Sequence, residues 1–296
     1  MTIILTLKKF ISMFLTIFMI ALSICPSNAP HDAKDTENVK LSFSVLSDCH
    51  IEGNNLKTYQ VFAKILTDAK KNESGNDAIV FLGDNTMNGQ DIESMFFYGA
   101  IDAIKPAKEV LVATGNHDLS NGEGEYNTFA DRFMDYNNMF FGSELEKPYY
   151  YKVIEGCYFI MLSTEDATVD TMYISDEQLQ WLGKVLAQAE QTNSPVFVMN
   201  HYPVDYIEGR AFYDLADVLN DYDNLLYFCG HTHNEYSEES VYEVYGIDCI
   251  NLPKCTEHVY EDYDTGIGAQ VEVYDGEIVV RIRDFYDGIW LEEYSY

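Results

Sequence analysis

Five short polar blocks in this sequence contain five of the seven histidines, together with aspartate and asparagine side chains that could bind a metal ion. In chain order the blocks are Asp48-Cys49-His50, Gly83-Asp84-Asn85, Gly115-Asn116-His117-Asp118, Asn200-His201-Tyr202-Pro203 and Gly230-His231-Thr232-His233. Carboxylate, imidazole and amide groups are the ligands that hard and borderline divalent cations prefer. Together the five blocks supply enough of these groups for two cations.

Each block directly follows an apolar run that is typical of a buried strand. Val45-Leu46 precedes Asp48 and Phe81-Leu82 precedes Asp84, for example. Any one block has an ordinary explanation, because Gly-Asp is a common turn and a single histidine is often structural. Loops at the carboxyl ends of strands in an α/β sheet converge on one crevice, so five blocks in this position favour a common site. We expect Gly83, Gly115 and Gly230 to allow sharp backbone turns beside the ligands.

The elements that must position these blocks follow from hydrophobic periodicity, which alternates between strand and helix patterns. Strands are predicted over 41–47, 77–82, 109–113, 196–199 and 225–228. Helices are predicted over 56–71, 92–104, 126–141, 175–191 and 211–220. Hairpins are predicted over 149–163 and 271–282, the second turning at Asp275-Gly276. This order of elements predicts an α/β fold with two packed sheets and helices outside them.

Composition limits the class of partner. The chain has 296 residues, is 47% hydrophobic and carries a formal net charge of -31. One domain over residues 41–296 could bury a full core at that size. A surface of such negative charge repels nucleic acid backbones and anionic lipid headgroups. We therefore expect a small-molecule substrate and no nucleic acid duplex, and nothing in the sequence indicates a partner protein.

Residues 1–29 have the pattern of a secretory signal peptide, and 30–40 form a polar linker. Lys8 and Lys9 precede an apolar stretch over 10–24 that is too short for a comfortable membrane span. The sequence thus predicts an exported, extracellular or cell-surface protein. Ser27-Asn28-Ala29 suits signal peptidase, although Pro30 follows it. An uncleaved anchor, or a lipid on Cys25 in a lipoprotein-like box with a bulky Ile24, remains an alternative.

The cysteines do not form a disulfide framework. Beyond the first 29 residues they number five, at irregular spacing: 49, 157, 229, 249 and 255. Cys49 and Cys229 come at the ends of predicted core strands and are expected to be small buried hydrophobes. One bridge between Cys249 and Cys255 stays open as a possibility.

Taken together, the five blocks resemble the complete signature of the calcineurin-like metallophosphoesterases. The resemblance covers about residues 41 to 285, and its most specific parts are Gly-Asn-His-Asp at 115–118 and Gly-His-Thr-His at 230–233. It implies an α/β fold of the four-layer αββα type, a sandwich of two mixed β-sheets flanked by helices. It also implies a dinuclear metal centre at the edge of the sheets.

The resemblance further implies a role for each residue. One metal would be held by Asp48, His50 and His233, the other by Asn116, His201 and His231, and Asp84 would bridge both. His117 would face the substrate, with Asp118 fixing the orientation of its ring. Oxygen and nitrogen ligands admit Mn, Fe or Zn, so the identity of the two divalent ions stays open.

The implied reaction is hydrolysis of a phosphate monoester or diester. Two cations roughly 3.5–4 Å apart lower the pKa of a shared water, giving a hydroxide that attacks phosphorus while His117 assists the leaving group. Purple acid phosphatases carry a tyrosine three residues after the bridging aspartate, where this chain has Met87, so a tyrosinate-bound ferric ion is not expected.

Two other functions compete with this interpretation. The fold could serve as a metal-binding scaffold without turnover, which the presence of His117 argues against. A metallo-β-lactamase-type hydrolase is excluded because Asn234-Glu235, not Asp-His, follows His233. Candidate substrate contacts are Tyr126, Tyr202 and Arg210, although aromatic packing and surface charge explain them equally well.

Overall fold

The structure is a computed structural model that describes residues 38–71, 75–119, 125–166, 171–207, 210–256 and 266–296. The predicted signal peptide and most of the linker lie outside these residues, as does the side chain of Arg210. Within the described part of the chain, no helix combines the length and the apolar character needed to cross a membrane.

The first sheet has six strands in the order β12-β11-β10-β1-β2-β3. Its parallel half consists of β1 (Leu41–Leu46), β2 (Ala78–Phe81) and β3 (Glu109–Val112). Its antiparallel half consists of β10 (Ile267–Val273), β11 (Ile278–Asp284) and β12 (Ile289–Ser295). The two halves join where β1 pairs with β10.

The second sheet also has six strands, in the order β4-β5-β6-β7-β9-β8. Four central strands are parallel: β5 (Cys157–Met161), β6 (Val196–Met199), β7 (Leu225–Cys229) and β9 (Ile247–Asn251). The antiparallel edges are β4 (Tyr150–Ile154) and β8 (Val241–Val244). Parallel strands bring their carboxyl ends to one edge, which is what a shared site requires.

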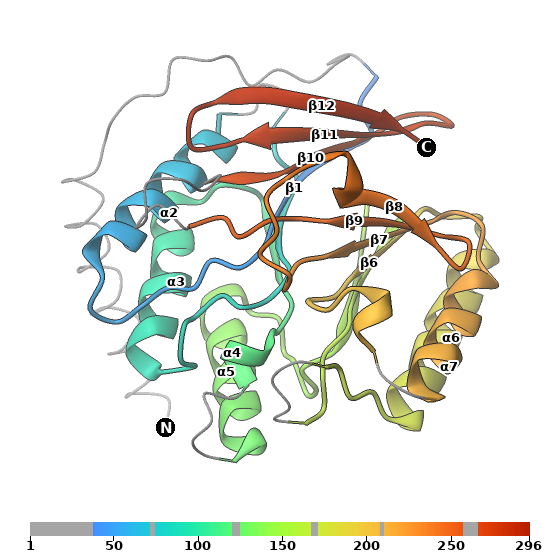
Figure 1. Cartoon of the computed structure of the whole chain (residues 1–296), viewed down its shortest axis with the longest axis horizontal. Helices are drawn as coiled ribbons and strands as arrows, with labels where there is room; N and C mark the ends of the chain where they lie inside the picture. Colours follow the sequence, from blue (N-terminus) through green and yellow to red (C-terminus); the bar gives the residue numbers. More distant parts are fainter. Residues whose placement is uncertain (1–37, 72–74, 120–124, 167–170, 208–209, 257–265) are drawn as a thin grey trace.

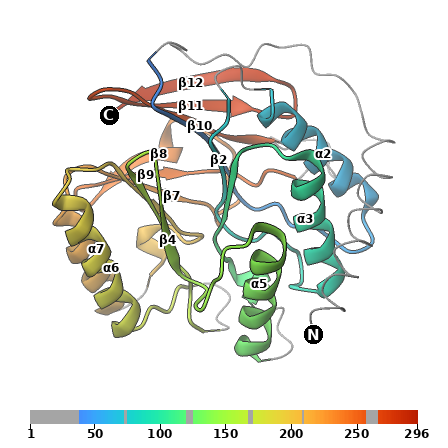
Figure 2. The same cartoon turned by 180° about the vertical axis from the view of Figure 1, so that it is seen from behind.

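Helices cover the outer face of each sheet (Figures 1 and 2). The first sheet is covered by α2 (Leu56–Ala69), α3 (Asp91–Ile104) and α5 (Tyr126–Phe141). The second sheet is covered by α6 (Asp176–Glu190) and α7 (Arg210–Asn220). Short helical turns occur at α4 (Asn116–Leu119), η1 (Val204–Tyr206) and η2 (Glu238–Ser240). The predicted four-layer αββα sandwich is confirmed.

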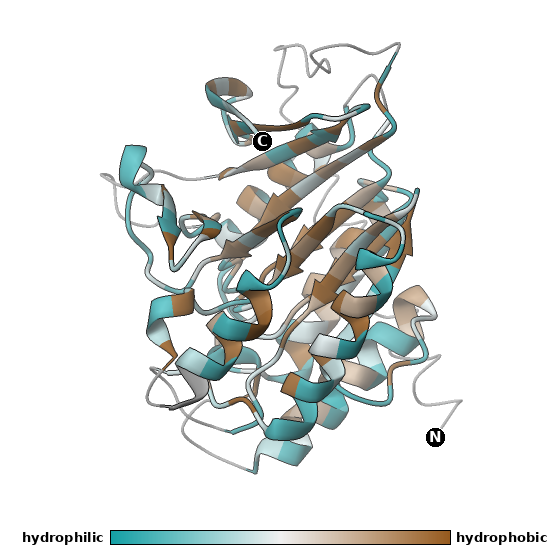
Figure 3. Ribbon diagram, turned by 90° about the vertical axis from the view of Figure 1, so that its right-hand side faces the viewer, coloured by the Kyte–Doolittle hydropathy of each residue, from teal (hydrophilic) through white to brown (hydrophobic). Residues whose placement is uncertain are grey.

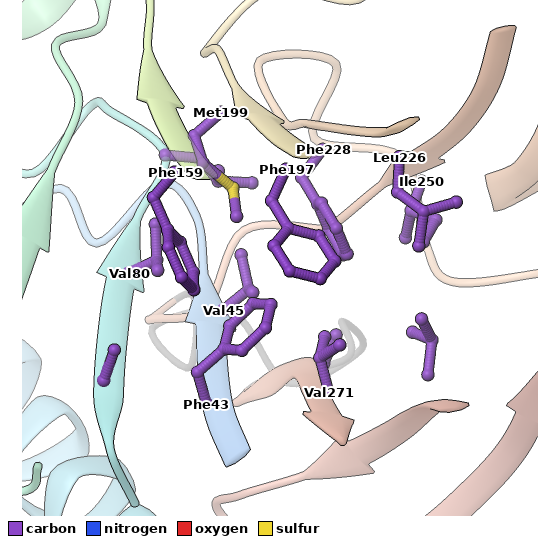
Figure 4. Packing of buried hydrophobic residues seen from close by; sticks show 14 of the residues in the cluster. Phe43, Val45, Val80, Phe159, Phe197, Met199, Leu226, Phe228, Ile250 and Val271 are labelled. Atoms are coloured by element: carbon purple, nitrogen blue, oxygen red, sulfur yellow. The ribbon is translucent and has the colours of Figure 1, made fainter. Parts of the chain in front are cut away.

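An aromatic and aliphatic core holds the two sheets together. The ring of Phe43 on β1 lies 4.8 Å from the rings of both Phe159 and Phe197 on the facing sheet, in edge-to-face contact. Figure 4 shows these side chains interdigitating between the sheets. The strands are hydrophobic along most of their length, whereas the helices carry polar outer faces (Figure 3). This packing makes the sheet edges rigid supports for the loops.

Most predicted elements agree with the observed ones. The helix over 126–141 and the strand over 196–199 have the expected bounds, and the Ser175 side chain caps α6 by accepting a hydrogen bond from the backbone N–H of Gln178. The prediction did not resolve α4, which is a single turn. The possible Cys249–Cys255 bridge is absent, because Cys249 faces the cluster under α6 and α7 while Cys255 lies in the cluster under α2 and α3.

Candidate metal centre

All seven predicted metal ligands lie at one edge of the sandwich, where the carboxyl ends of strands from both sheets meet. Asp48 and His50 follow β1, Asp84 follows β2 and Asn116 follows β3. His201 follows β6, and His231 and His233 follow β7. The first sheet therefore supplies the carboxylates, the amide and one imidazole, and the second sheet supplies the remaining imidazoles.

One group of four donor atoms comes together around Asp48. Asp48 Oδ1 lies 3.0 Å from His233 Nε2, and His233 Nε2 lies 3.1 Å from His50 Nε2. His50 Nε2 is in turn 3.5 Å from Asp84 Oδ2. Within the described residues, these four side chains form a cluster whose ligand atoms all lie within 4.8 Å of one another.

A second group gathers around His201. His201 Nε2 lies 3.1 Å from Asn116 Oδ1 and 3.1 Å from His231 Nδ1. It also lies 3.3 Å from Asp84 Oδ2, the same oxygen that faces His50. The two groups therefore share one carboxylate oxygen, which is the position that a bridging ligand would occupy.

The spacing of these atoms fits metal coordination. Bonds of about 2.0–2.2 Å to nitrogen and oxygen place neighbouring ligands of one ion about 3.0–3.5 Å apart. The donor separations in both groups, from 3.0 Å to 3.5 Å, lie in that range. Two imidazole nitrogens that face each other at 3.1 Å, as in His50 and His233, need a proton or a cation between them.

Each of the two aspartates is anchored by one oxygen and presents the other. Asp84 Oδ1 accepts a hydrogen bond of 2.8 Å from the backbone N–H of His117, which leaves Oδ2 facing the histidines. Asp48 Oδ2 accepts hydrogen bonds from Ser47 Oγ and from the backbone N–H of His231. The carboxylates are thus oriented by the protein before any ligand binds.

The backbone at the site is in a conformation that side chains rarely adopt. Five of the seven predicted ligands have φ in the left-handed region: Asp48 (54°), His50 (40°), Asp84 (49°), His231 (71°) and His233 (52°). Each such residue costs of order 1–3 kcal/mol in local strain, and it persists only where the surrounding structure over-determines it. The concentration of strain at one place is typical of a functional site.

Two of the three glycines beside the ligands make room for neighbouring side chains, which is not the reason we expected. A Cβ atom at Gly115 would lie 2.1 Å from Asp84 Oδ1, and one at Gly230 would lie 1.9 Å from Ser47 Oγ. Only Gly83, with φ of 115°, needs the backbone freedom of glycine. The other two positions require the absence of a side chain, not a sharp turn.

The geometry around His117 departs from the expectation. Its ring is oriented by Nδ1, which lies 2.6 Å from the carbonyl oxygen of Met87, and its Nε2 lies 3.9 Å from Asp84 Oδ2. Asp118 does not contact that ring. It is buried and accepts hydrogen bonds from the backbone N–H groups of Gly115, Asn85 and Thr86. Asp118 therefore holds the loops together, and a carbonyl that no sequence motif reveals orients the histidine.

Electrostatics within the centre depend on a buried histidine. Burial would raise the pKa of Asp84, but the charge of His201 and a hydrogen bond from it lower that pKa to about 2. Burial opposes charge on His201 as well, yet Asp84 and Asp48 raise its pKa to about 9. The carboxylates of Asp84 and Asp48 thus favour the protonated form of His201.

The pKa values of a neighbouring aspartate and a neighbouring histidine shift in the opposite sense to those of Asp84 and His201. Burial and the negative charge of Asp84 raise the pKa of Asp118 to about 6. Burial and the positive charge of His201 lower the pKa of His231 to about 4. A neutral imidazole is the form that binds a metal, so His231 is ready to coordinate at neutral pH whereas His201 must first lose a proton.

The structure places the two described tyrosines among the candidate substrate contacts in different surroundings. Tyr202 is fully buried and packs with its ring centroid 4.7 Å from that of His231, so it supports the imidazole from behind. Tyr126 donates a hydrogen bond to the carbonyl of Thr164. Tyr206, which sequence reasoning did not single out, is 41% exposed, and its ring lies 5.6 Å from the ring of His231. Its place in η1, just after His201, was the only available signal.

Comparison with known proteins agrees with this geometry. A family model described as calcineurin-like phosphoesterase matches residues 41–235. No curated protein sequence matches the chain. The structure resembles a dimetal phosphatase from Danio rerio, with 14% sequence identity, a TM-score of 0.61, and coverage of 87% of this chain and 99% of that one.

A purple acid phosphatase from seeds of yellow lupin (Lupinus luteus) is similar at 14% identity and a TM-score of 0.59. That match covers 86% of this chain and 53% of the lupin protein. At such low identity both likenesses concern the fold alone. The match to the family model extends over more than half of the sequence, and the chain belongs to the calcineurin-like phosphoesterase family.

Proposed function

We propose that this protein hydrolyses phosphate esters with two divalent metal ions bound at the sheet edge. The observation that carries the proposal is the arrangement of two donor groups around one shared oxygen, Asp84 Oδ2. A metal-binding scaffold would need the donors alone. The half-exposed His117 beside them, which no ligand position requires, favours catalysis over a scaffold.

Each donor group would hold one ion. We assign the first ion to Asp48, His50 and His233, the second to Asn116, His201 and His231, and the bridging position to Asp84. Neutral Asn116 suits this arrangement, because another carboxylate beside Asp84 would neutralise more of the cationic charge that a phosphoryl group needs. Ions bound at these positions would activate water and offset negative charge on the phosphoryl oxygens.

His117 would assist the leaving group. Its Nδ1 is committed to the carbonyl oxygen of Met87, which places the hydrogen on Nδ1 in the neutral ring and leaves Nε2 on the open side. With its side chain 31% exposed, it can exchange protons with solvent between turnovers. As an imidazolium it would donate a proton from Nε2 to the departing oxygen.

Mn, Fe and Zn all suit the oxygen and nitrogen donors. Met87 stands where purple acid phosphatases have a tyrosine, so we propose a pair of divalent ions without a tyrosinate ligand. Both phosphomonoesters and phosphodiesters are candidate substrates. The net charge of -31 makes a small substrate more compatible than a polyanion.

We also propose that the protein is exported, on the basis of the charged and apolar pattern in residues 1–29. Fractionation of the producing cells, with detection of the intact and processed chain by mass spectrometry, tests this. A chain found only in the cytosol with Met1 to Ala29 intact would contradict export.

The activity is tested by varying the bridging aspartate. Wild type and Asp84→Ala, each reconstituted with Mn²⁺, are compared on chromogenic phosphate monoesters and diesters. Loss of the shared ligand should lower kcat/KM by at least about 10³-fold, since each metal contributes several kcal/mol to the transition state. Elemental analysis should find two metal equivalents in wild type and fewer in the variant.

One control variant and one contrary outcome make this experiment decisive. Asp275→Ala removes a carboxylate that is far from the site, on the hairpin after β10, and should leave activity unchanged. If wild type is no faster than Asp84→Ala on any substrate while binding two metal equivalents, the scaffold function is correct instead.

A further inference from the structure

Two buried cysteines lie directly behind the metal centre, and the proposed reaction uses neither. Cys49 Sγ and Cys255 Sγ are 3.4 Å apart although 206 positions separate them in the sequence. Both residues are fully buried, and neither is in a disulfide in this structure. Cys49 stands between Asp48 and His50, and Cys255 follows the last strand of the parallel part of the second sheet, β9.

Backbone and side-chain hydrogen bonds hold the two cysteines in register. The N–H of Cys255 donates to the carbonyl oxygen of Ser47 at 3.1 Å, and Thr256 Oγ1 donates to the carbonyl oxygen of Cys49. These bonds flank the thiols on both sides. A disulfide needs a sulfur separation of about 2.05 Å, so the sulfur atoms must approach by little more than about 1 Å, which small side-chain rotations supply.

We propose that Cys49 and Cys255 form a disulfide that fixes the turn carrying Asp48 and His50. The oxidant is a small-molecule or protein disulfide. One cysteine thiolate attacks a sulfur of the oxidant and releases the first thiol, and the second cysteine thiolate then displaces the other. The two cysteines lose two electrons and two protons, and the oxidant is reduced to two thiols. An oxidising compartment rests on the proposed export, and the effect on metal binding rests on the proposed function.

The position of the proposed disulfide indicates that it would restrain the turn that carries Asp48 and His50. Asp48 and His50 have left-handed φ angles of 54° and 40°, so the residues on both sides of Cys49 are strained. Such a turn keeps its shape only if the surroundings restrain it. A covalent link from Cys49 to the segment after β9 would join this turn of the first sheet to the second sheet. It would also close a very long loop, the case in which a cross-link restricts the unfolded chain most.

The experiment refolds the full chain with Mn²⁺ in a mixture of reduced and oxidised glutathione, because the folded protein buries both thiols. Free thiols are alkylated and the protein is digested without reduction. Mass spectrometry should find one linked peptide pair containing Cys49 and Cys255, with Cys25, Cys157, Cys229 and Cys249 alkylated. Cys157→Ser should retain the link, and Cys49→Ser and Cys255→Ser should each lack it.

Two further measurements address the effect of the bond. The oxidised protein should unfold about 5–10 °C above the same protein reduced with a phosphine. Its affinity for Mn²⁺, measured by equilibrium dialysis, should be about tenfold higher than that of the reduced protein. Neither measurement depends on phosphoesterase activity.

Alkylation of both Cys49 and Cys255 in the refolded wild type would overturn the proposal, as would a link between Cys249 and Cys255. A bond that forms without changing the Mn²⁺ affinity would overturn its role at the metal centre. If neither the oxidised nor the reduced protein binds Mn²⁺ while the linked peptides are present, the proposed metal-dependent function fails and the disulfide stands.

Discussion

Two of the places where the molecule buries charged side chains differ in how that charge is balanced. Under α2, the guanidinium of Arg283 binds the carboxylate of Asp68 through two hydrogen bonds, of 2.7 Å and 3.1 Å, and both residues are almost wholly buried. Arg283 also lies over the ring of Trp290. At the sheet edge, Asp48, Asp84 and Asp118 are also buried, and their carboxylates contact imidazoles and polar hydrogen-bond donors.

The contrast teaches how a structural pair differs from a binding site. A buried carboxylate needs a compensating charge, and Arg283 provides a permanent one with a geometry that satisfies both oxygens of Asp68. At the sheet edge the chain supplies histidines, whose charge can be removed. The carboxylate oxygens that face inward therefore remain available to an external cation.

The largest effect should come from removing the proton donor at the sheet edge while leaving the proposed metal ligands intact. We expect His117→Ala to lower kcat by about 10²–10⁴-fold because it removes the proton donor. Metal content should be unchanged, since the ring is not assigned to a metal. The loss should be greater for alkyl esters, whose leaving oxygen needs a proton, than for nitrophenyl esters. An equal loss for both would show that His117 does not act on the leaving group.

Breaking the permanent pair should affect stability without affecting chemistry. Asp68→Ala leaves Arg283 buried without its carboxylate partner, and we expect it to cost about 3–5 kcal/mol in free energy of unfolding. Urea unfolding of the metal-free protein measures this. Asp287→Ala, which removes an exposed pair with Lys64 at 3.7 Å, is the matched control and should cost less than about 1 kcal/mol. The activity of the folded Asp68 variant should match that of wild type.

A smaller effect is expected in the metal-free protein, where His201 and Asp84 should behave as an ion pair like Arg283 and Asp68. The pKa of His201 is raised from 6.5 to about 9, so its stabilisation is fully present below pH 6.5 and is lost as pH rises through 9. The pKa of Asp84 is lowered from 3.8 to about 2, so its stabilisation is present above pH 3.8 and is lost as pH falls through 2. The pair therefore stabilises the metal-free protein most between those limits.

The measurement compares metal-free wild type with His201→Gln by urea unfolding across pH. We expect wild type to be more stable by a few kcal/mol near pH 5–6, and the difference to shrink toward pH 9. With Mn²⁺ the trend should reverse, because the metal binds neutral imidazole and is favoured as pH rises. A difference that does not vary with pH would mean that His201 is neutral in the metal-free protein.

Much of the fold could be predicted from the sequence. Periodicity was sufficient to predict the helix over 126–141, because it extends over several turns. It was also sufficient for the strands that precede the five polar blocks, because they lie between clear turn signals. The single turn α4, which begins at Asn116, was missed because four residues contain too little periodicity. The separate strands β8 and β9 were not predicted, because four or five residues contain too little periodicity.

The site was predictable in its residues but not in its internal contacts. Sequence spacing placed all seven ligand candidates at strand ends, and the fold brings them together. It could not reveal that the carbonyl oxygen of Met87 orients His117, because any residue type supplies a carbonyl. The same holds for the role of Gly115, since only the approach of Asp84 from another strand excludes a side chain there.

The sequence by itself determined which chemical groups are present, the order of strands and helices, and the family. These properties depend on local pattern and on residue type. Only the tertiary structure decided that one oxygen of Asp84 faces both histidine groups, that Asp118 supports loops, and that Cys255 meets Cys49 instead of Cys249. Such facts depend on distances between segments far apart in the chain, which packing of the two sheets sets and residue spacing does not encode.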